Sequence, residues 1–289
     1  MKFIKAKSIL TSNGGTGINP YRGCTHGCIY CDSRSTCYHT PLPFEDIEVK
    51  ENAVELLDSA LKAKRKKIMI GTGSMCDPYM PCEKELMITR GCLEVIRNHG
   101  FGATVHTKSS LVLRDFDILK NINLHTKAVL QMTLTTADDS LCKKIEPNVC
   151  PTSERFSVLM EAKKEGIPTV VWLSPFLPYI NDTRENISFL LEMCATAGVK
   201  GLVVFGIGLT LRDGNQQYFY RCLDEKFPGL RDKYIRQFGS SYEIESPNSA
   251  SLYQMIKKFC TERGIMYRPR DTVSYLAEFQ QRDLQRTLF

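Results

Sequence analysis

Three cysteines near the N-terminus, Cys24, Cys28 and Cys31, have the residue type and spacing most able to do chemistry in this chain of 289 residues. They form a C-x3-C-x2-C pattern within residues 19–32, and the glycines at 23 and 27 favour a backbone bent around a bound object. Three thiolates on one short loop can hold three irons of a cubane cluster, whereas electron-transfer proteins usually supply four cysteines. The pattern therefore predicts an iron–sulfur cluster with one iron left open to another molecule.

Other interpretations of the three cysteines stay open from the residues alone. A zinc site needs a fourth ligand, and His26 is the candidate, although its place between the first two cysteines makes joint tetrahedral ligation awkward. A disulfide is disfavoured because three cysteines cannot pair among themselves and nothing marks the chain as secreted. Three inert buried thiols are a further alternative. The remaining cysteines lack tight ligand spacing, so a second cluster built from them is disfavoured.

The loop resembles the signature of the radical S-adenosylmethionine (SAM) superfamily, in which an aromatic residue, here Tyr30, directly precedes the third cysteine. The resemblance implies that the three cysteines bind a 4Fe–4S cluster whose open iron is chelated by SAM. An electron from the cluster would cleave SAM into methionine and a 5′-deoxyadenosyl radical that abstracts hydrogen from a substrate. We expect Tyr30 and Asp32 to contribute to cofactor binding. We also expect a reduced flavodoxin or a ferredoxin-type protein as the electron donor.

Helical and strand patterns alternate after this loop, which is typical of βαβ units and a parallel sheet. The predicted helices cover residues 53–63, 84–99, 115–121, 152–165 and 183–196, and the predicted strands cover 67–71, 104–107, 126–133, 169–173 and 201–205. With the segment that enters the cysteine loop, six βα units precede residue 210. Six units match the partial (β/α)6 radical SAM barrel that the resemblance implies, because a complete barrel needs eight. Residues 211–289 show two helical segments and no strong strand pattern, so we predict a C-terminal helical extension packed on a core of residues 1–210.

Strand ends supply the remaining candidates, because ligands of a parallel barrel gather at the C-terminal ends of its strands. The second strand enters a segment where radical SAM enzymes usually hold a Gly-Gly-Glu-like sequence that binds the SAM amino group. This sequence has no Glu there and offers Gly71, Thr72 and Gly73. Thr133 and Thr135, at the end of the fourth strand, offer hydroxyls to the SAM ribose or carboxylate. One of the two threonines is expected to be an ordinary strand residue.

Several short segments between residues 19 and 182 resemble the spore photoproduct lyase-like subgroup of the superfamily. Besides the cysteine loop they are Ser74-Met-Cys-Asp77, Thr107-Lys108, Met132-Thr133, Ile145-Glu-Pro147, Pro175-Phe-Leu-Pro178 and Asn181-Asp182. The resemblance implies that Lys108 contacts the SAM carboxylate and that Thr133 lies near SAM. It places Cys76 near the position of the lyase's catalytic, hydrogen-donating cysteine, with Ser74 as the alternative aligned residue. Asp32 replaces a lyase tyrosine, which argues against thymine-dimer repair; the implied substrates remain nucleic acids or nucleotides.

Composition narrows the class of protein only moderately. The net charge of +6 permits an anionic partner without requiring one. No apolar run reaches the ~20 residues that a membrane-spanning helix needs, and the first residues lack the apolar stretch of a signal peptide. Twelve cysteines without such a signal indicate a reducing, cytoplasmic setting. Two alternatives of other classes are a zinc-binding nucleic-acid module and a 4Fe–4S electron-transfer or sensor protein that does not use SAM.

Overall fold

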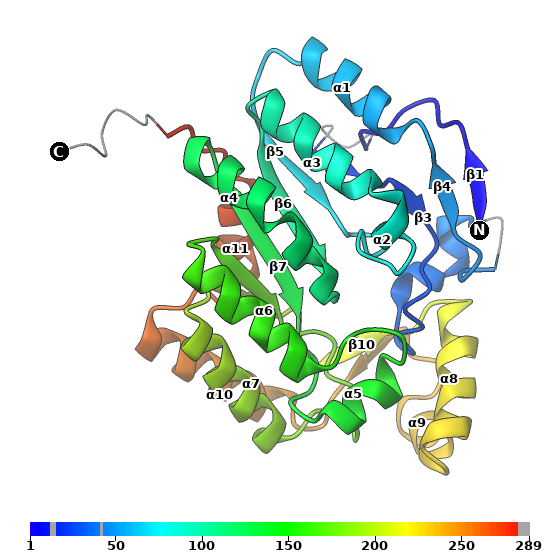
Figure 1. The fold of residues 1–289 in the computed structure, drawn as a ribbon. Coiled ribbons are helices and arrows are strands. Elements are labelled where there is room, and N and C mark those ends of the chain that lie inside the picture. Colours follow the sequence, from blue (N-terminus) through cyan, green and yellow to red (C-terminus); the bar gives the residue numbers. More distant parts are fainter. Residues whose placement is uncertain (12–15, 41–42, 283–289) are drawn as a thin grey trace.

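A six-stranded parallel sheet forms the centre of the computed structural model, which describes residues 1–11, 16–40 and 43–282 (Figure 1). The strand order is β2-β5-β6-β7-β8-β9, and each neighbouring pair is parallel. The bounds are β2 Gly17–Ile18, β5 Met69–Thr72, β6 Gly102–Thr107, β7 Ala128–Thr133, β8 Thr169–Trp172 and β9 Gly201–Val203. Every residue of the central β7 is buried, as expected of a parallel strand covered on both faces. The predicted α/β fold with six parallel strands is confirmed.

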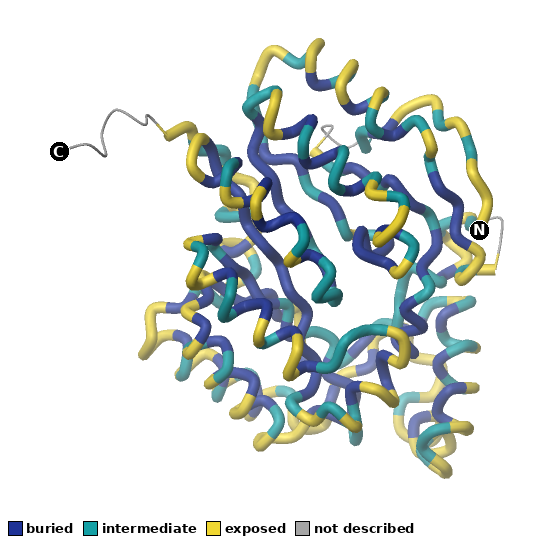
Figure 2. Tube along the Cα trace, in the orientation of Figure 1, coloured by how far each residue is buried: buried dark blue, intermediate teal, exposed yellow. Residues whose placement is uncertain are grey.

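Helices cover the outer face of this sheet, which is the near face in Figure 1. They are α1 Ala53–Ala63, α3 Ile88–Asn98, α4 Phe116–His125, α6 Thr152–Lys164 and α7 Arg184–Ala197. Each buries one side, as α1 does with Ala53, Leu57 and Leu61 at four-residue spacing, and Figure 2 shows the buried strands beneath partly exposed helices. One long helix was predicted over 84–99, but Met87 adopts a left-handed conformation and separates α2 Glu83–Leu86 from α3.

A small three-stranded sheet, which the sequence analysis did not predict, leads the chain into the cysteine loop. Its strands are β1 Lys2–Ile4, β4 Glu48–Lys50 and β3 Tyr21–Arg22, in the order β1-β4-β3. β3 ends two residues before the first cysteine, and two short 3-10 turns, Asp32–Arg34 and Thr36–Tyr38, follow the last one. The loop is therefore held between ordered segments on both sides.

The C-terminal region adds helices and a strand that the prediction missed. The helices are α8 Asn215–Lys226, α9 Leu230–Phe238, α10 Ser249–Arg263 and α11 Pro269–Ala277, and α5 Asp139–Ile145 lies earlier in the chain. Strand β11, Glu243–Glu245, pairs antiparallel with β10, Gly208–Thr210. The expectation of no strand here was wrong, because three residues are too short to show alternation. α10 buries Leu252 and Ile256 in the main core; the division at residue 210 stays a prediction.

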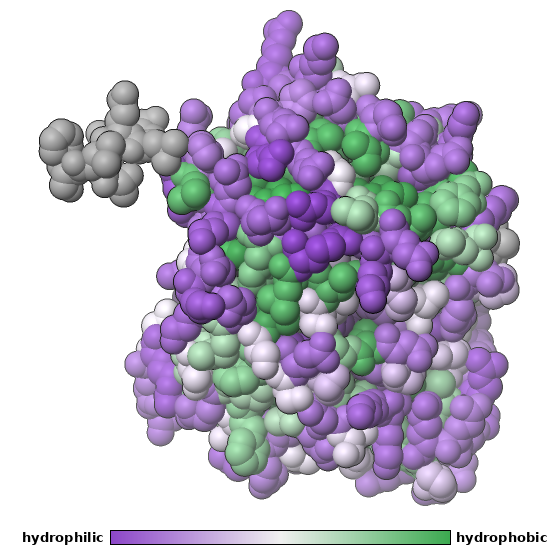
Figure 3. Space-filling model, viewed as in Figure 1, coloured by the Kyte–Doolittle hydropathy of each residue, from purple (hydrophilic) through white to green (hydrophobic). Residues whose placement is uncertain are grey.

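The surface over the helical face is mostly hydrophilic, with smaller hydrophobic patches between the polar side chains (Figure 3). None of the helices in the described part of the chain combines the length and apolar character that crossing a bilayer requires.

Candidate active site

Two glycines let the cysteine loop lie close to neighbouring backbone. Gly23 has φ +81°, and a Cβ there would lie 2.6 Å from the carbonyl oxygen of Phe44. That oxygen accepts a hydrogen bond from the amide of Cys24 at 2.8 Å. Gly27 has φ +69°, and its Cβ would come within 3.2 Å of Asn148 and Pro147. Because left-handed backbone and close approach both favour glycine, the two positions fix the path of the loop.

The segment after α5 holds the cysteine loop from the other side. Ile29 donates its amide to the carbonyl of Ile145 at 3.0 Å, and Asn148 donates its amide to the carbonyl of His26 at 3.1 Å. The Asn148 side chain adds a third bond, from Nδ2 to the carbonyl of Thr25 at 2.9 Å. The Ile145-Glu-Pro147 segment noted in the sequence is thus a support for the loop.

The three cysteines differ in burial. Cys24 and Cys28 are buried and Cys31 is half-buried. Burial raises the pKa of Cys24 above its ordinary value and raises the pKa of Cys28 to about 12. Because metals bind thiolates, cluster assembly here must release protons. His26, the fourth ligand in the zinc alternative, is buried with Nδ1 3.5 Å from Oδ2 of Asp77, and its pKa is lowered by burial.

The donor set of the loop suits a cluster. Among the described residues no three Cys, His, Asp or Glu side chains converge on one ion, the cysteine triplet included. In a cubane each thiolate binds a different iron, so the three sulfurs need not meet at one point. A structural zinc ion would require four ligands in a tight tetrahedron.

A fully buried charge pair stands behind the loop and connects it to the sheet. Nη2 of Arg155 lies 2.7 Å from Oε2 of Glu146, and both side chains are completely buried. The hydroxyl of Tyr30 donates to Oε1 of Glu146, and burial raises the pKa of Tyr30, so the phenol stays protonated. Arg155 also donates to the carbonyl of Thr133 at 3.1 Å. The residue before the third cysteine is therefore linked through one ion pair to the end of β7.

A cavity of about 630 Å³ opens at the C-terminal ends of the central strands. This volume is in the usual range for a small-molecule site. One side of the cavity, here called the cofactor-side wall, consists of predicted site residues: Tyr30, Cys31, Asp32, Ser74, Lys108 and Thr133. The structure thus brings the third cysteine together with side chains from three strand ends, as the barrel topology predicts.

Two residues of the cofactor-side wall are held in place by hydrogen bonds. The amide of Lys108 donates to Oδ2 of Asp77 at 2.7 Å. Burial acts to lower the pKa of Lys108, but the negative charge of Cys28, Glu146 and Asp77 raises it overall, so the ammonium persists at neutral pH. The hydroxyl of Thr133 lies 2.8 Å from Nε2 of His106. Lys108 thus presents a fixed positive charge to the cavity.

Four residues predicted to bind cofactors do not line this cavity. Gly71 and Thr72 pair with β2 inside the sheet, and Gly73 follows them with φ +99°. Thr135 is fully buried, and its carbonyl accepts hydrogen bonds from the side chains of Asn181 and Asn186. Ser74 is the residue of this Gly-rich segment that reaches the cavity.

Gly73→Ala is expected to lower the free energy of unfolding by about 2–4 kcal/mol. An added Cβ would lie 2.0 Å from the carbonyl oxygen of His106, in addition to the strain of a positive φ. Gly100→Ala is the matched control, because Gly100 has φ +67° with no atom within 4 Å of a Cβ, and should cost only about 1 kcal/mol. Denaturant titration of both variants measures the difference, and equal losses would contradict the close approach of β5 and β6.

Cys76, predicted as a catalytic hydrogen donor, lies outside the cavity. Its thiol donates to the carbonyl of Tyr21 at 3.1 Å, and the side chain packs with Cys24 and Met80 behind the loop. Burial raises the pKa of Cys76 to about 12. The expectation that Cys76 sits at the barrel mouth was wrong, because the turn directs Ser74 there instead.

Cys76→Ala is therefore expected to leave the products of SAM cleavage unchanged and to cost about 1 kcal/mol of stability through the lost hydrogen bond. Product analysis by liquid chromatography and mass spectrometry checks the first part. A changed product distribution at full iron content would restore the hydrogen-donor role of Cys76.

The sequence analysis missed the residues on the opposite side of the cavity. They are His106, Trp172, Phe205, Glu243 and Glu245. Trp172, expected in the core, is half-buried and faces the cavity from the end of β8. Its place at a strand end was the available signal. The two glutamates belong to β11, for which the sequence gave no strand pattern.

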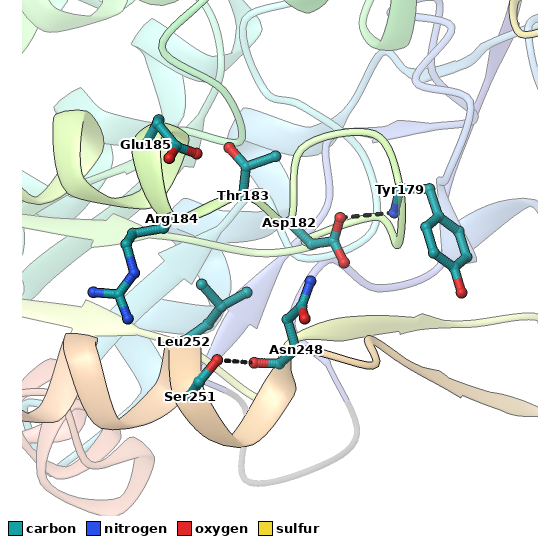
Figure 4. Close-up of a pocket in the computed structure, with 8 residues that line it drawn as sticks. All are labelled: Tyr179, Asp182, Thr183, Arg184, Glu185, Asn248, Ser251 and Leu252. Carbon is teal, nitrogen blue, oxygen red and sulfur yellow. Dashed lines mark hydrogen bonds between the residues drawn. The ribbon is translucent and has the colours of Figure 1, made fainter.

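A second cavity, of about 450 Å³, lies between the first turns of α7 and α10 (Figure 4). Asp182 faces it but is already satisfied, because it accepts hydrogen bonds from the amide of Tyr179 at 2.7 Å and from the hydroxyl of Ser246 at 2.5 Å. None of the predicted cofactor residues lines this cavity. The Asn181-Asp182 pair therefore serves to hold the turn before α7.

Comparison with known proteins places the chain in a family. A model described as the radical SAM superfamily matches residues 18–191, more than half of the chain, and the chain belongs to this superfamily. It is therefore a radical SAM protein, and its cofactors are a 4Fe–4S cluster and SAM. The resemblance drawn from the cysteine loop is confirmed.

Individual relatives are more distant. An uncharacterised protein of Mycobacterium bovis is 27% identical over 227 residues, which are 75% of this chain but only 65% of the mycobacterial protein. A radical SAM Nalpha-GlyT isomerase of Pseudomonas phage M6 is 25% identical over 256 residues, covering 86% of this chain and 52% of the phage protein. Spore photoproduct lyase complexed with dinucleoside spore photoproduct has a similar fold, with a TM-score of 0.61 at 13% identity over 92% of this chain and 78% of the lyase.

Proposed function

We propose that this protein reductively cleaves SAM at a 4Fe–4S cluster held by Cys24, Cys28 and Cys31, and that the resulting radical abstracts hydrogen from a substrate in the 630 Å³ cavity. One observation carries the proposal. The cavity joins Cys31 to Lys108 and Thr133, so the third cluster ligand shares a space with a cation and a hydroxyl at strand ends. The family match to residues 18–191 supports the chemistry.

The side chains of the cofactor-side wall would orient SAM. Lys108 would pair with the SAM carboxylate, since its charge persists at neutral pH. Thr133 and Ser74 would offer hydroxyls, and Tyr30 would be held rigid by Glu146. The cluster, when bound, supplies the electron that cleaves the sulfonium, and the protein contributes orientation and exclusion of water.

The substrate in this proposal is a nucleic acid, a nucleotide or a related nucleoside. The fold is similar to a lyase that was solved with a dinucleoside spore photoproduct, which supports this class by analogy. The phage relative is an isomerase, so a radical rearrangement is a second reaction type to test. A reduced flavodoxin or a ferredoxin-type protein would donate the electron. The zinc module and the SAM-independent electron carrier do not fit a chain whose cofactors are a cluster and SAM.

Anaerobic reconstitution with iron and sulfide, followed by dithionite and SAM, tests the proposal. The reconstituted protein should form 5′-deoxyadenosine and methionine in equal amounts, and samples without dithionite should form neither. Protein that holds about four irons per chain but produces no 5′-deoxyadenosine would overturn the proposed reaction.

Lys108→Met is expected to raise the dissociation constant of SAM by about tenfold to a hundredfold, because a charge-assisted hydrogen bond is lost. Isothermal titration calorimetry of the reconstituted protein measures the change. Lys66→Met, which removes an exposed lysine far from the cavity residues in sequence, is the control. Equal SAM affinity in both variants would exclude Lys108 as the carboxylate partner.

A further inference from the structure

The cavity has a second wall whose chemistry differs from that of the cofactor side. His106 stacks on Trp172 with ring centroids 4.5 Å apart and an interplanar angle of 18°. Phe205 meets Trp172 edge-on, with centroids 5.6 Å apart at 67°. Phe205 is 64% exposed although it lines the cavity. An ordered row of aromatic rings with one ring left open offers a stacking surface for a planar group.

Two carboxylates complete this wall. Glu243 and Glu245 lie on the same face of β11, because side chains alternate along a strand, and Ile244 between them is buried on the other face. Both glutamates line the cavity. Pairing of Gly208 with Glu245 and of Thr210 with Glu243 fixes their positions beside the strand that follows Phe205. Within the described part of the chain neither carboxylate has a salt-bridge partner.

The cavity as a whole is therefore acidic, although the chain carries a net charge of +6. Its charged lining residues are one cation, Lys108, and three anions, Asp32, Glu243 and Glu245. The guanidinium of nearby Arg212 is engaged by Asp32 at 3.5 Å and by the hydroxyl of Tyr242 at 2.9 Å. A phosphate placed against the two glutamates would meet like charge, whereas a protonated amine would be attracted.

We propose that the aromatic–acidic wall, made of His106, Trp172, Phe205, Glu243 and Glu245, selects a substrate that combines a planar ring with a protonated amine. This inference rests on the proposed function, since it takes the cavity as the substrate site. The ring packs against Phe205 and Trp172, and the amine forms charge-assisted hydrogen bonds with the glutamates. Among nucleic-acid-type substrates, an amine-bearing nucleoside fits this wall and a phosphodiester at the same place does not.

Binding of three related nucleosides to the reconstituted, SAM-loaded protein tests the charge requirement. The probes are 5-aminomethyl-2′-deoxyuridine, thymidine and thymidine 5′-monophosphate, which share a ring and differ in charge. We expect the amine to bind about tenfold or more tightly than thymidine, and the monophosphate to bind most weakly. Calorimetry measures all three. Trp172, the single tryptophan, gives a second readout, because its fluorescence in the cluster-free full chain should change when a ring stacks nearby.

Two sets of variants assign the effects to the wall. The double variant Glu243→Gln with Glu245→Gln should weaken the amine probe about tenfold or more and leave thymidine within about twofold. Phe205→Ala should weaken the amine probe and thymidine alike, by about tenfold, through lost stacking. Glu225→Gln, on the exposed face of α8, is the matched control and should change nothing.

Contrary outcomes are distinguishable. Monophosphate binding as tight as that of the amine would overturn the charge requirement. Loss of SAM affinity in the double glutamate variant, with unchanged probe affinity, would assign the carboxylates to the cofactor and overturn the substrate role. If wild-type protein forms 5′-deoxyadenosine but does not prefer the amine, only the inferred substrate class fails. If no 5′-deoxyadenosine forms, the proposed function fails as well.

Discussion

Arg155→Met is expected to lower the free energy of unfolding by about 3–5 kcal/mol, because it leaves a buried carboxylate without its partner. Arg155 and Glu146 are both fully buried and 2.7 Å apart. Arg155 also donates to the carbonyls of Cys150 at 2.9 Å and Thr133 at 3.1 Å, and Met cannot replace these bonds. Denaturant titration of the cluster-free full chain measures the loss.

The pH dependence of this loss tests its cause. In the wild type, burial opposes ionisation of Glu146, but Arg155 and Lys108 hold its pKa below the ordinary value. Its stabilising contribution is therefore present at neutral pH and is lost only as the pH falls into the acid range below that value. Without Arg155, burial should raise the pKa of Glu146, so the variant loses stability as the pH rises. The deficit should be larger at about pH 8 than at about pH 5.

A double variant, Glu146→Gln with Arg155→Met, is the control for the unpaired charge. It should recover much of the stability lost in Arg155→Met, because no buried charge remains unpaired. A deficit that does not depend on pH, together with no recovery in the double variant, would show that packing around Arg155 matters and that the ion pair does not.

Cys31→Ala is expected to reduce formation of 5′-deoxyadenosine by roughly a thousandfold or more, as when one member of a catalytic unit is removed. Cys31 is the cysteine of the triplet that lines the cavity, and without it the cluster loses one of three protein ligands. Chromatographic assay of 5′-deoxyadenosine after dithionite reduction measures the loss.

Cys37→Ala is the matched control for this variant. Cys37 lies six residues further along the chain, is exposed, and is not part of the C-x3-C-x2-C pattern. It should keep wild-type activity and iron content. Wild-type activity in Cys31→Ala, or an equal loss in Cys37→Ala, would separate the cysteine triplet from the reaction.

The features that the sequence predicted are those set by local pattern. Helix α1 matches the predicted residues 53–63, and the central strands lie within a few residues of the predicted ones. The cysteine loop, Lys108 and Thr133 were found because strand ends of a parallel sheet meet at one edge, so positions far apart in sequence predict one site.

The features that the sequence did not predict depend on tertiary contacts. Strand β11 has three residues and exists through its pairing with β10, so no periodicity marks it. Cys76 was placed at the cavity by its nearness to Ser74 in sequence, but the turn between them points the two side chains to different sides. The Glu146–Arg155 pair joins residues nine apart that no spacing rule singles out.

The central claim is that the cluster on Cys24, Cys28 and Cys31 leaves one iron open to SAM. Electron paramagnetic resonance of the dithionite-reduced, reconstituted protein, recorded without and with SAM, tests it most directly when the SAM carboxylate carries oxygen-17. The account predicts that SAM shifts the cluster signal and that electron–nuclear double resonance detects coupling to the labelled carboxylate. A reduced cluster whose spectrum is the same with saturating SAM, and which shows no coupling, would contradict the account.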